Sequence, residues 1–252
     1  MSHAYKIADL PTGPPEGADK DDFKKEYKEL ADRIRDLQRR LYAEGKRSLL
    51  IILQGMDAAG KDGAIRELMK CVNPMGVEIS SWKKPSEEEF AHDFLWRIHR
   101  KVPRKGMIAI HNRSHYEEVL IQRVRSWIDM DRVRQRFDHI NNFERLLVQE
   151  NDTMILKFFL NVSKKEQLER LEERKEVVRK MWKYNPEDFK VRARWDDYMK
   201  AYEDVFENCG PDIPWRPIPT DKNWYKEYLI LKTVTETLES MDLKYPRISI
   251  DD

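Results

Sequence analysis

The stretch LLIILQGMDAAGKDG, residues 49–63, decides the fold. A continuous apolar run ends at Gly55, and Gly60 and Lys61 follow after four residues, which is the G-x-x-x-x-G-K spacing of a phosphate-binding loop. Such a loop points successive backbone N–H groups at one anion, and the following helix adds its positive N-terminal end. The stretch therefore predicts a buried parallel strand, a P-loop and a helix, with Lys61 reaching the outer phosphates. The residues expected to contact phosphate here are Gly55, Ala58, Ala59, Gly60, Lys61, Asp62 and Gly63.

Two carboxylates set this loop apart from an ordinary P-loop. Asp57 lies inside it, and Asp62 stands where the usual loop has Ser or Thr. Bare carboxylates repel phosphates strongly at low dielectric, but a divalent cation between the two groups removes the repulsion. An ordinary P-loop offers its hydroxyl to Mg²⁺, so a carboxylate here has to take over part of that task. We expect Asp57 to be a metal ligand, whereas Asp62 is either a second metal ligand or an acidic residue in the first turn of a helix.

Strand and helix patterns alternate along the rest of the chain. Apolar runs bounded by Gly or polar residues are typical of strands buried in a parallel sheet. The expected strands are 48–54, 76–80, 106–112, 153–162 and, bent by its prolines, 213–219. Because helices separate the strands, we expect right-handed crossovers and a three-layer α/β fold around a central parallel sheet.

Two short signals predict where helices begin. Ser86 with Glu89, and Ser163 with Glu166, each have the spacing of a capping box. The first signal predicts a helix that continues to Ile98.

The N-terminal part divides into an arm and a helix. Residues 1–19 are rich in Pro and Gly, and from about 21 to 45 apolar residues recur in alternating steps of four and three. This spacing places them on one stripe of a helix. The helix docks on the protein's own core or, since a 3.5-residue period also suits a helix pair, on another subunit. We therefore expect an arm and helix over 1–46 and a phosphate-binding domain over 47–252.

A second group of candidate site residues follows the expected strand 106–112. In open α/β sheets ligands bind beyond the carboxyl ends of the strands, so this segment should face the P-loop. Asn112 ends the strand, and Arg113 offers a planar fork to phosphate oxygens. Glu117 is either a metal ligand or an anchor for Arg113.

A long charged segment lies between the last two expected strands. Between Lys164 and Lys183 there are eight Lys/Arg and five Glu, and such runs are usually solvated helix faces with i,i+4 ion pairs. Asn185 followed by Pro186 predicts a new helix start. The segment has the size of a lid over about 164–207, and we expect some of its cations to bind phosphates when the lid closes.

Composition excludes several classes of protein. Charged residues make up 37% of the 252-residue chain, well above the roughly 25% of an average soluble domain. The 47 Lys+Arg and 46 Asp+Glu nearly cancel, and the aromatic residues show no stacking motif, so nucleic-acid binding is not expected. Two cysteines, no signal-peptide core and no apolar run of about 20 residues predict a cytoplasmic protein that does not span or enter a membrane.

Five motifs in this order resemble the family-2 polyphosphate kinases. The resemblance covers most of the chain, roughly from Phe23 to the final helix. Its motifs are GMDAAGKDG (55–63), HDFLWR (92–97), NRSHYEEVL (112–120), ERKEVVRKMWKYNPEDF (173–189) with RWDDY (194–198) after it, and DKNWY (221–225). The resemblance implies a P-loop phosphotransferase that moves phosphate between inorganic polyphosphate and nucleotides. It also implies a thymidylate-kinase-like core with a helical lid, assembled as a homodimer or homotetramer.

The family's functional residues fall on five positions of this chain. Its P-loop aspartate corresponds to Asp57 and its lysine to Lys61, and these help to hold Mg²⁺, or alternatively Mn²⁺, and the phosphates being exchanged. Its Walker B arginine falls on Arg113. Its lid arginine and the lysine of the lid's Trp-Lys pair fall on Arg174 and Lys183.

One departure from the family concerns Asn112. Many members have Asp-Arg-Ser at the Walker B site, where the Asp ligates Mg²⁺, but this chain has Asn112-Arg113-Ser114. The motif that begins at Asn112, NRSHYE, resembles that of the family branch that accepts both AMP and ADP. The expected activity is therefore transfer of the terminal phosphate of polyphosphate to AMP or ADP, giving ADP or ATP. Two alternatives stay open: an ATP-dependent nucleoside monophosphate kinase, and a polyphosphate-binding P-loop protein without catalysis. Adenine nucleotides are the expected partners, and the sequence does not decide whether other purines are accepted.

Overall fold

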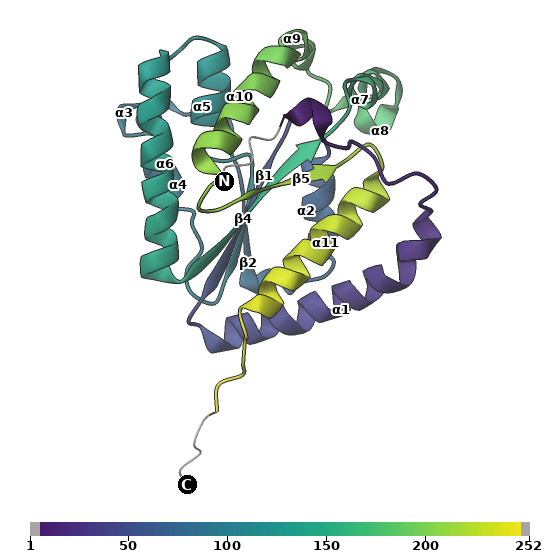
Figure 1. Ribbon diagram of the computed structural model, residues 1–252, viewed down its shortest axis with the longest axis vertical. Coiled ribbons are helices and arrows are strands. Elements are labelled where there is room, and N and C mark those ends of the chain that lie inside the picture. Colours follow the sequence, from purple (N-terminus) through teal and green to yellow (C-terminus); the bar gives the residue numbers. More distant parts are fainter. Residues whose placement is uncertain (1–5, 248–252) are drawn as a thin grey trace.

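Five parallel strands form the centre of the molecule (Figure 1), in a computed structural model that describes residues 6–247. Within these residues the strand order is β2-β3-β1-β4-β5, and every neighbouring pair is parallel. The strands are β1 (Ser48–Gln54), β2 (Val77–Ser81), β3 (Ile108–Asn112), β4 (Thr153–Asn161) and β5 (Trp215–Pro219). All the expected strands are present, so the predicted α/β fold with a central parallel sheet is confirmed.

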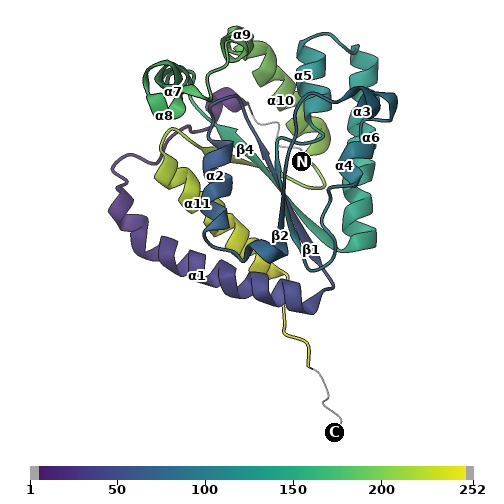
Figure 2. The ribbon, with the colours of Figure 1, turned by 180° about the vertical axis from the view of Figure 1, so that it is seen from behind.

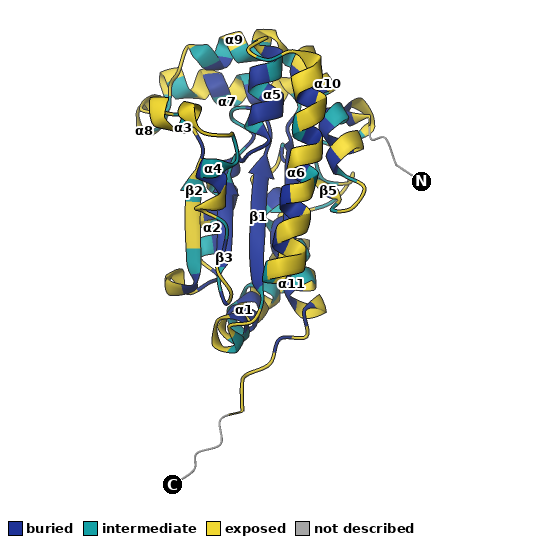
Figure 3. Ribbon diagram, turned by 90° about the vertical axis from the view of Figure 1, so that its left-hand side faces the viewer, coloured by how far each residue is buried: buried dark blue, intermediate teal, exposed yellow. Residues whose placement is uncertain are grey.

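The position of β1 explains why its sequence is an unbroken apolar run. It lies between β3 and β4, and all seven of its residues are buried, as the dark central strand in Figure 3 shows. A central strand with helices over both faces needs apolar side chains at nearly every position. The edge strand β2 is different, because its residues are half-buried or exposed and Ile79 keeps 44% of its surface exposed.

Helices cover both faces of the sheet, and a third group lies across one end of it (Figures 1 and 2). One face carries α1 (Lys20–Glu44), α2 (Lys61–Met69) and α11 (Asn223–Ser240). The other face carries α4 (Trp96–His99), α5 (Glu117–Val124), α6 (Met130–Asn151) and α10 (Trp195–Cys209). Across the carboxyl ends of the strands lie α7 (Lys164–Glu176), α8 (Val178–Met181) and α9 (Glu187–Ala193). The short elements are η1 (Ile7–Asp9), η2 (Pro74–Gly76) and α3 (Glu87–Ala91).

The long helix α1 docks on the protein's own core. Ile34, Leu37 and Leu41 are buried on the side of α1 that faces α11. Asp19 begins the helix with a capping box, and Gly45 ends it in the left-handed conformation. Of the two roles expected for this helix, packing within the chain is the one that the structure contains.

The segment after Ser86 differs from the expectation of one helix. Ser86 and Glu89 do form the predicted capping box, but α3 ends after five residues. Asp93 Oδ1 then accepts a hydrogen bond from Leu95 N at 2.9 Å. A side-chain bond of this kind offers the backbone an alternative to the helix. The prediction of a single helix through Ile98 was therefore wrong, and two short helices replace it.

Two helix starts also depart from prediction in detail. Ser163 caps α7 by accepting from Glu166 N at 3.1 Å, but the Glu166 carboxylate binds Arg170 Nε at 2.8 Å instead of returning to the cap. Only half of the predicted capping box forms, because the ion pair takes its acidic partner. The cap of α9 falls on Pro186, one residue later than predicted, although Asn185 Oδ1 still accepts a backbone hydrogen bond at 3.1 Å.

The sheet brings three chain segments together beyond its carboxyl ends. Leu53 of β1 is level with Asn112 of β3, and Gln54 is level with Phe159 of β4. The loops that follow these strands therefore begin at the same height, below α7 and α8 (Figure 1). Within residues 6–247 we find no helix with the length and apolar character needed to cross a bilayer.

Candidate active site

The loop after β1 has a backbone suited to anion binding. Gly55 (φ 147°), Ala58 (φ 62°) and Gly60 (φ 99°) all have positive φ, a conformation that glycine adopts without strain. A Cβ atom on Gly55 would stand 2.7 Å from Leu160 O, so a larger residue does not fit there. α2 begins at Lys61, and its unpaired N–H groups face the loop. The predicted order of strand, P-loop and helix is confirmed.

Lys61 is folded back onto its own loop. Its Nζ donates to Gly55 O at 2.8 Å and to Met56 O at 3.1 Å, and its side chain is buried. Burial, with a smaller effect from Arg113, lowers the pKa of Lys61 to about 8. The ammonium is held by neutral carbonyl groups, and a phosphate oxygen is a stronger acceptor than these. Lys61 can therefore exchange its present partners for a phosphate.

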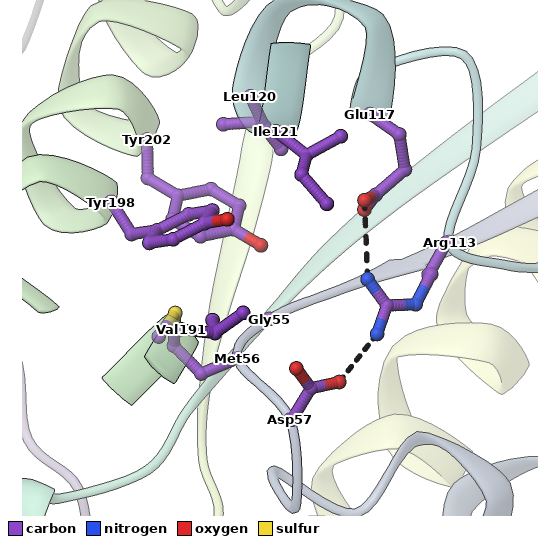
Figure 4. A pocket seen from close by; sticks show the side chains of 10 residues that line it. All are labelled: Gly55, Met56, Asp57, Arg113, Glu117, Leu120, Ile121, Val191, Tyr198 and Tyr202. Atoms are coloured by element: carbon purple, nitrogen blue, oxygen red, sulfur yellow. Dashed lines mark hydrogen bonds and ion pairs between the residues drawn. The ribbon is translucent and has the colours of Figure 1, made fainter. Parts of the chain in front are cut away.

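Arg113 bridges two carboxylates at the centre of the site (Figure 4). It follows β3 with a positive φ of 66°. One guanidinium nitrogen donates to Asp57, and Nη1 donates to Glu117 Oε2 at 3.1 Å. The charges of Glu117 and then Asp57 raise the pKa of Arg113 above its ordinary value. Of the two roles expected for Glu117, this geometry matches the anchor of Arg113.

Asp57 stays ionised although it is largely enclosed. Burial alone would raise the pKa of this carboxyl, but Arg113, Lys61 and Arg174 outweigh burial and bring the pKa below its ordinary value. The backbone oxygen of Asp57 accepts from Gln167 Nε2 at 3.0 Å, which ties α7 to the loop. An ionised carboxylate in this position has the hard oxygen atoms that Mg²⁺ prefers.

Asp62 joins the P-loop to the segment above it. Its Oδ1 accepts from Asn112 Nδ2 at 2.9 Å, and its Oδ2 accepts from Lys183 Nζ at 2.8 Å. Partial burial raises the pKa of Asp62, but the hydrogen bonds from Lys183 and Asn112 bring it below its ordinary value. Three residues predicted from separate motifs are thus in direct contact.

Two arginines on α7, one turn apart, contact different parts of the protein. Arg170 Nη1 donates to Ala58 O at 3.1 Å, and its Nη2 donates to Thr220 O at 2.6 Å, so it fastens α7 to the P-loop and to the end of β5. Arg174 Nη1 donates to Asp188 Oδ2 at 2.6 Å, which joins α7 to α9. Arg170 also pairs with Glu166 on α7 itself, so of the two arginines only Arg174 joins α7 to another helix of the lid segment.

An open cleft of about 950 Å³ runs over the P-loop between these elements. Its basic lining residues are Lys61, Arg66, Lys83, Arg113, Arg170, Arg174, Arg179, Lys180, Lys183 and Lys226. Its acidic lining residues are Asp57, Asp62, Glu166, Glu169, Glu173 and Glu227. Ten cations against six anions give the cleft a positive excess that the whole chain, at +1, does not have. The geometry therefore suits a polyanion.

Several of these cations were missed by the reading of the sequence. Arg66 lies on α2 and Lys226 on α11, which cover the same face of the sheet. The only sequence signal for Lys226 is its place in the first turn of the helix that follows β5. That turn begins at the carboxyl end of a strand, where ligands of α/β folds gather. The cleft residues Arg179 and Lys180 lie in the charged run and could not be told from a solvated face.

A second, much smaller pocket lies behind the Arg113–Asp57 pair (Figure 4). Its volume is about 20 Å³, roughly the room that one water molecule needs. Its other lining residues are Gly55, Met56, Glu117, Leu120, Ile121, Val191, Tyr198 and Tyr202. The pocket is too small for a nucleotide or a phosphate chain in this form, whereas the large cleft over the P-loop has room for either. The aromatic rings of Tyr198 and Tyr202, both on α10, lie on this side of the ion pair.

Within the described part of the chain, no group of three or more His, Cys, Asp or Glu residues is arranged to hold a metal ion by itself. Cys71 and Cys209 are buried free thiols, as expected from a chain without a disulfide framework.

Comparisons with known proteins agree on one family. The family model described as polyphosphate kinase 2 matches residues 17–246. An AMP/ADP-polyphosphate phosphotransferase of Meiothermus ruber is 46% identical over 219 residues, which are 86% of this chain and 82% of the relative. An ADP-polyphosphate phosphotransferase of Rhodopseudomonas palustris is 40% identical over 240 residues, 88% of this chain and 83% of the relative. A crystal structure of polyphosphate kinase 2 from Arthrobacter aurescens TC1 is similar at a TM-score of 0.95 and 37% identity, and covers 100% of this chain and 91% of that one.

Proposed function

Because this chain belongs to the polyphosphate kinase 2 family, we propose that it is a kinase that transfers the terminal phosphate of inorganic polyphosphate to AMP or ADP. The observation that carries the proposal is the basic cleft, which runs over the P-loop and contains Lys61, Asp57 and Arg113 together. Two highly anionic substrates have to meet end to end in this reaction, and the excess of cations in the cleft offsets their mutual repulsion.

Positioning and electrostatics supply most of the catalysis. In-line phosphoryl transfer spreads charge over the oxygens of the transferred group, so fixed donors around that group lower the barrier. Arg113 is held in place by Asp57 and Glu117 before any substrate arrives. Lys61 turns from its carbonyl partners to the phosphates, and the N–H groups of the P-loop hold them. The acceptor is already an anionic phosphate oxygen, so a general base is not required.

A divalent cation fits the donor set of the P-loop. Mg²⁺ is commonly held by one or two carboxylates together with substrate phosphates, and Asp57 and Asp62 are the two carboxylates of this loop. We assign Mg²⁺, or Mn²⁺ in its place, to Asp57 first and Asp62 second. When bound, the ion neutralises charge on the phosphates. Asp57 and Asp62 would hold this ion, and in this structure each is paired with a cation of the cleft, Asp57 with Arg113 and Asp62 with Lys183.

The lid is proposed to be the segment 164–207, and its movable part to run from the end of α7 to α9, because Gln167 and Arg170 hold the earlier turns of α7 on the P-loop. In α10 the side that faces α5 and α6 is buried, with Tyr198, Ala201 and Val205 inside the protein. In contrast, Val178 and Trp182 are 80% and 77% exposed. Closure would bring Arg174 and Lys183 onto the phosphates.

The use of both AMP and ADP is proposed from the Asn112-Arg113-Ser114 motif. Asn112 donates to Asp62 Oδ1 at 2.9 Å. It therefore holds the Asp62 carboxylate in place, whereas an aspartate at position 112 would add a second carboxylate there. The Meiothermus relative is named for both nucleotides. Assembly into a homodimer or homotetramer and a cytoplasmic location stay predictions.

The decisive experiment supplies Mg²⁺ and long-chain polyphosphate with either AMP or ADP, with no ATP added, and separates the nucleotide products by chromatography. ADP and then ATP from AMP, and ATP from ADP, are expected. Omitting polyphosphate controls for contaminating adenylate kinase, and Lys61→Ala controls for other contaminating enzymes. Product from ADP alone would remove the assignment of AMP. No product from either, with turnover when ATP is the donor, would favour the nucleoside monophosphate kinase, and polyphosphate binding without any turnover would favour the non-catalytic protein.

A further inference from the structure

Lys226, in the first turn of α11, is a buried cation at the floor of the cleft. Its side chain is 1% exposed, yet it lines the cleft beside the P-loop. Nζ donates to Asn223 Oδ1 at 2.8 Å and, over a longer 3.4 Å, to Gly60 O. The carboxylate paired with it, Glu227 Oε1, is 3.9 Å away, which is beyond hydrogen-bond distance. Neither of its two hydrogen-bond partners carries a charge.

A second buried lysine shows what a purely structural partner set looks like in this fold. Lys157 in β4 is also fully buried, and its Nζ donates to Glu144 Oε2 at 2.8 Å, Tyr116 OH at 2.9 Å and Cys209 O at 2.6 Å. An ammonium has three N–H donors, and those of Lys157 are all used, one of them on a carboxylate. Buried charges are ordinarily compensated in this way. Lys226 has no carboxylate within hydrogen-bond distance, since Glu227 stays 3.9 Å away, so its N–H groups are available to an anion in the cleft.

The P-loop leaves room for the Lys226 ammonium. A Cβ atom would stand 2.9 Å from Lys226 Nζ if added to Gly60, and 3.3 Å from it if added to Gly63. Gly60 and Gly63 thus expose the backbone of the loop and the start of α2 to Lys226. The side chain approaches the same turn whose N–H groups bind phosphate.

The surroundings of Lys226 suit a phosphate chain better than a nucleotide base. Glu227, Arg170 and Arg66 line the cleft at this end and act electrostatically on Lys226, so two cations stand against one carboxylate. The two tryptophans of the cleft lie elsewhere, since Trp82 follows β2 on the opposite edge of the sheet and Trp182 follows α8. A base gains affinity by stacking on rings, whereas inorganic polyphosphate has only charged oxygens to offer.

We propose that Lys226 binds a phosphate of the donor chain upstream of the one being transferred, so that polyphosphate leaves the P-loop along α2 and α11. The inference rests on the proposed function and names the path of its donor. Burial lowers the pKa of Lys226 to about 8, so the side chain is protonated at neutral pH and keeps its charge for the anion.

The test compares four variants of the whole chain. Lys226→Met removes the charge and keeps the length, and Lys226→Arg keeps the charge. Lys222→Met changes an exposed lysine one turn away that does not line the cleft. Lys157→Met changes the buried lysine whose three N–H groups all bond to groups inside the protein. For each variant we would measure KM for long-chain polyphosphate, KM for ADP, the melting temperature without ligand, and the rise in melting temperature on adding polyphosphate.

Lys226→Met is expected to raise KM for polyphosphate roughly 10-fold or more, as loss of a charged hydrogen bond does. KM for ADP should change less than about 2-fold, and the ligand-free melting temperature should stay within about 3 °C. The stabilisation by polyphosphate should shrink. Lys226→Arg should recover most of the affinity, and Lys222→Met should match the parent protein. Lys157→Met should melt lower because the buried Glu144 loses its ammonium partner.

Three outcomes would overturn the proposal. A melting temperature of Lys226→Met as low as that of Lys157→Met, with both KM values unchanged, would make Lys226 a structural support of the P-loop. A rise confined to KM for ADP would place the nucleotide here. If polyphosphate raises the melting temperature of Lys226→Met as much as that of the parent protein, the phosphate chain does not contact Lys226. If the parent protein does not turn over polyphosphate, the proposed function fails, and the melting shifts still decide whether Lys226 binds the chain.

Discussion

The floor and the lid of the cleft carry similar charges but hold them differently. Beside the P-loop the floor holds Asp57, Lys61 and Arg113, which follow β1 and β3, and Glu117 anchors Arg113 from the smaller pocket. Its arginine is fixed by two carboxylates, and its lysine is buried against the loop. The movable part of the lid, from the end of α7 to α9, carries Lys183, which is 34% exposed and contacts the P-loop at Asp62. Groups held rigidly before binding stabilise a transition state, and groups that arrive with a moving segment contribute mainly to binding.

The largest effect that would test this contrast is expected from Asp57→Asn. The variant loses a metal ligand and one of the two anchors of Arg113, so kcat should fall about 10³-fold and the remaining activity should need more Mg²⁺. Initial rates over a Mg²⁺ series measure both effects. Asp62→Asn is the matched variant in the same loop, and it should lose less because Asp62 does not contact Arg113. An unchanged Mg²⁺ dependence in Asp57→Asn would remove the metal role from this residue.

Loss of either floor cation comes next. Lys61→Ala and Arg113→Ala should each lower kcat by at least about 10²-fold, as removal of one transition-state donor often does. KM for polyphosphate should change far less than kcat, and steady-state kinetics separate the two. Near-normal turnover in either variant would contradict its assignment to the floor.

Alkaline pH should weaken the floor of the cleft. The pKa of Lys61 lies at about 8, below its ordinary 10.5, so the side chain is charged at pH 7 and loses its proton as the pH rises through 8. The ratio kcat/KM for polyphosphate should therefore fall above pH 8, since this ratio reports the ionisation of the free enzyme. Asp57, whose pKa is lowered, stays ionised over this range. Lys226 also has a pKa of about 8, and the profile of Lys226→Arg therefore isolates Lys61. A flat profile in that variant from pH 7 to 9 would show that the charge of Lys61 is not needed.

The smallest effect is expected in the lid. Lys183→Ala should raise KM for polyphosphate roughly 5-fold, the size of one partly exposed charged contact, with little change in kcat. Lys165→Ala is the control, because Lys165 lies on α7, is 88% exposed and does not line the cleft. If kcat falls as steeply in Lys183→Ala as in Lys61→Ala, the lid belongs to the rigid part of the site and the contrast disappears.

Features with a local cause were predictable from the sequence. The P-loop follows from glycine spacing after an apolar strand, and its structure agrees. Asn112 and Arg113 were expected to face it because the strands of one sheet end together. The break between α3 and α4 was missed, since apolar spacing does not show that Asp93 bonds the backbone of Leu95.

Features that depend on distant parts of the chain could not be predicted. Lys226 contacts Gly60 across 166 positions of sequence, and its place in the first turn of α11 is its one local signal, which does not predict burial. The partners of Asp57 and Asp62 were also unforeseen. The sequence suggested metal as their partner, and the structure pairs them with Arg113 and with Lys183 and Asn112. The division of the chain at residue 46 stays a prediction.

These carboxylate–cation pairs make ligand binding a competition. Asp57 occupies Arg113, Asp62 occupies Lys183 and Asp188 occupies Arg174, so an anion has to displace an internal rival at each cation. A lone chloride or orthophosphate ion displaces one rival and gains little. A polyphosphate chain displaces several together, and each step after the first is intramolecular, which multiplies its affinity without any new kind of contact. We therefore expect the protein to favour a donor with several linked phosphates, and small anions to be weak inhibitors.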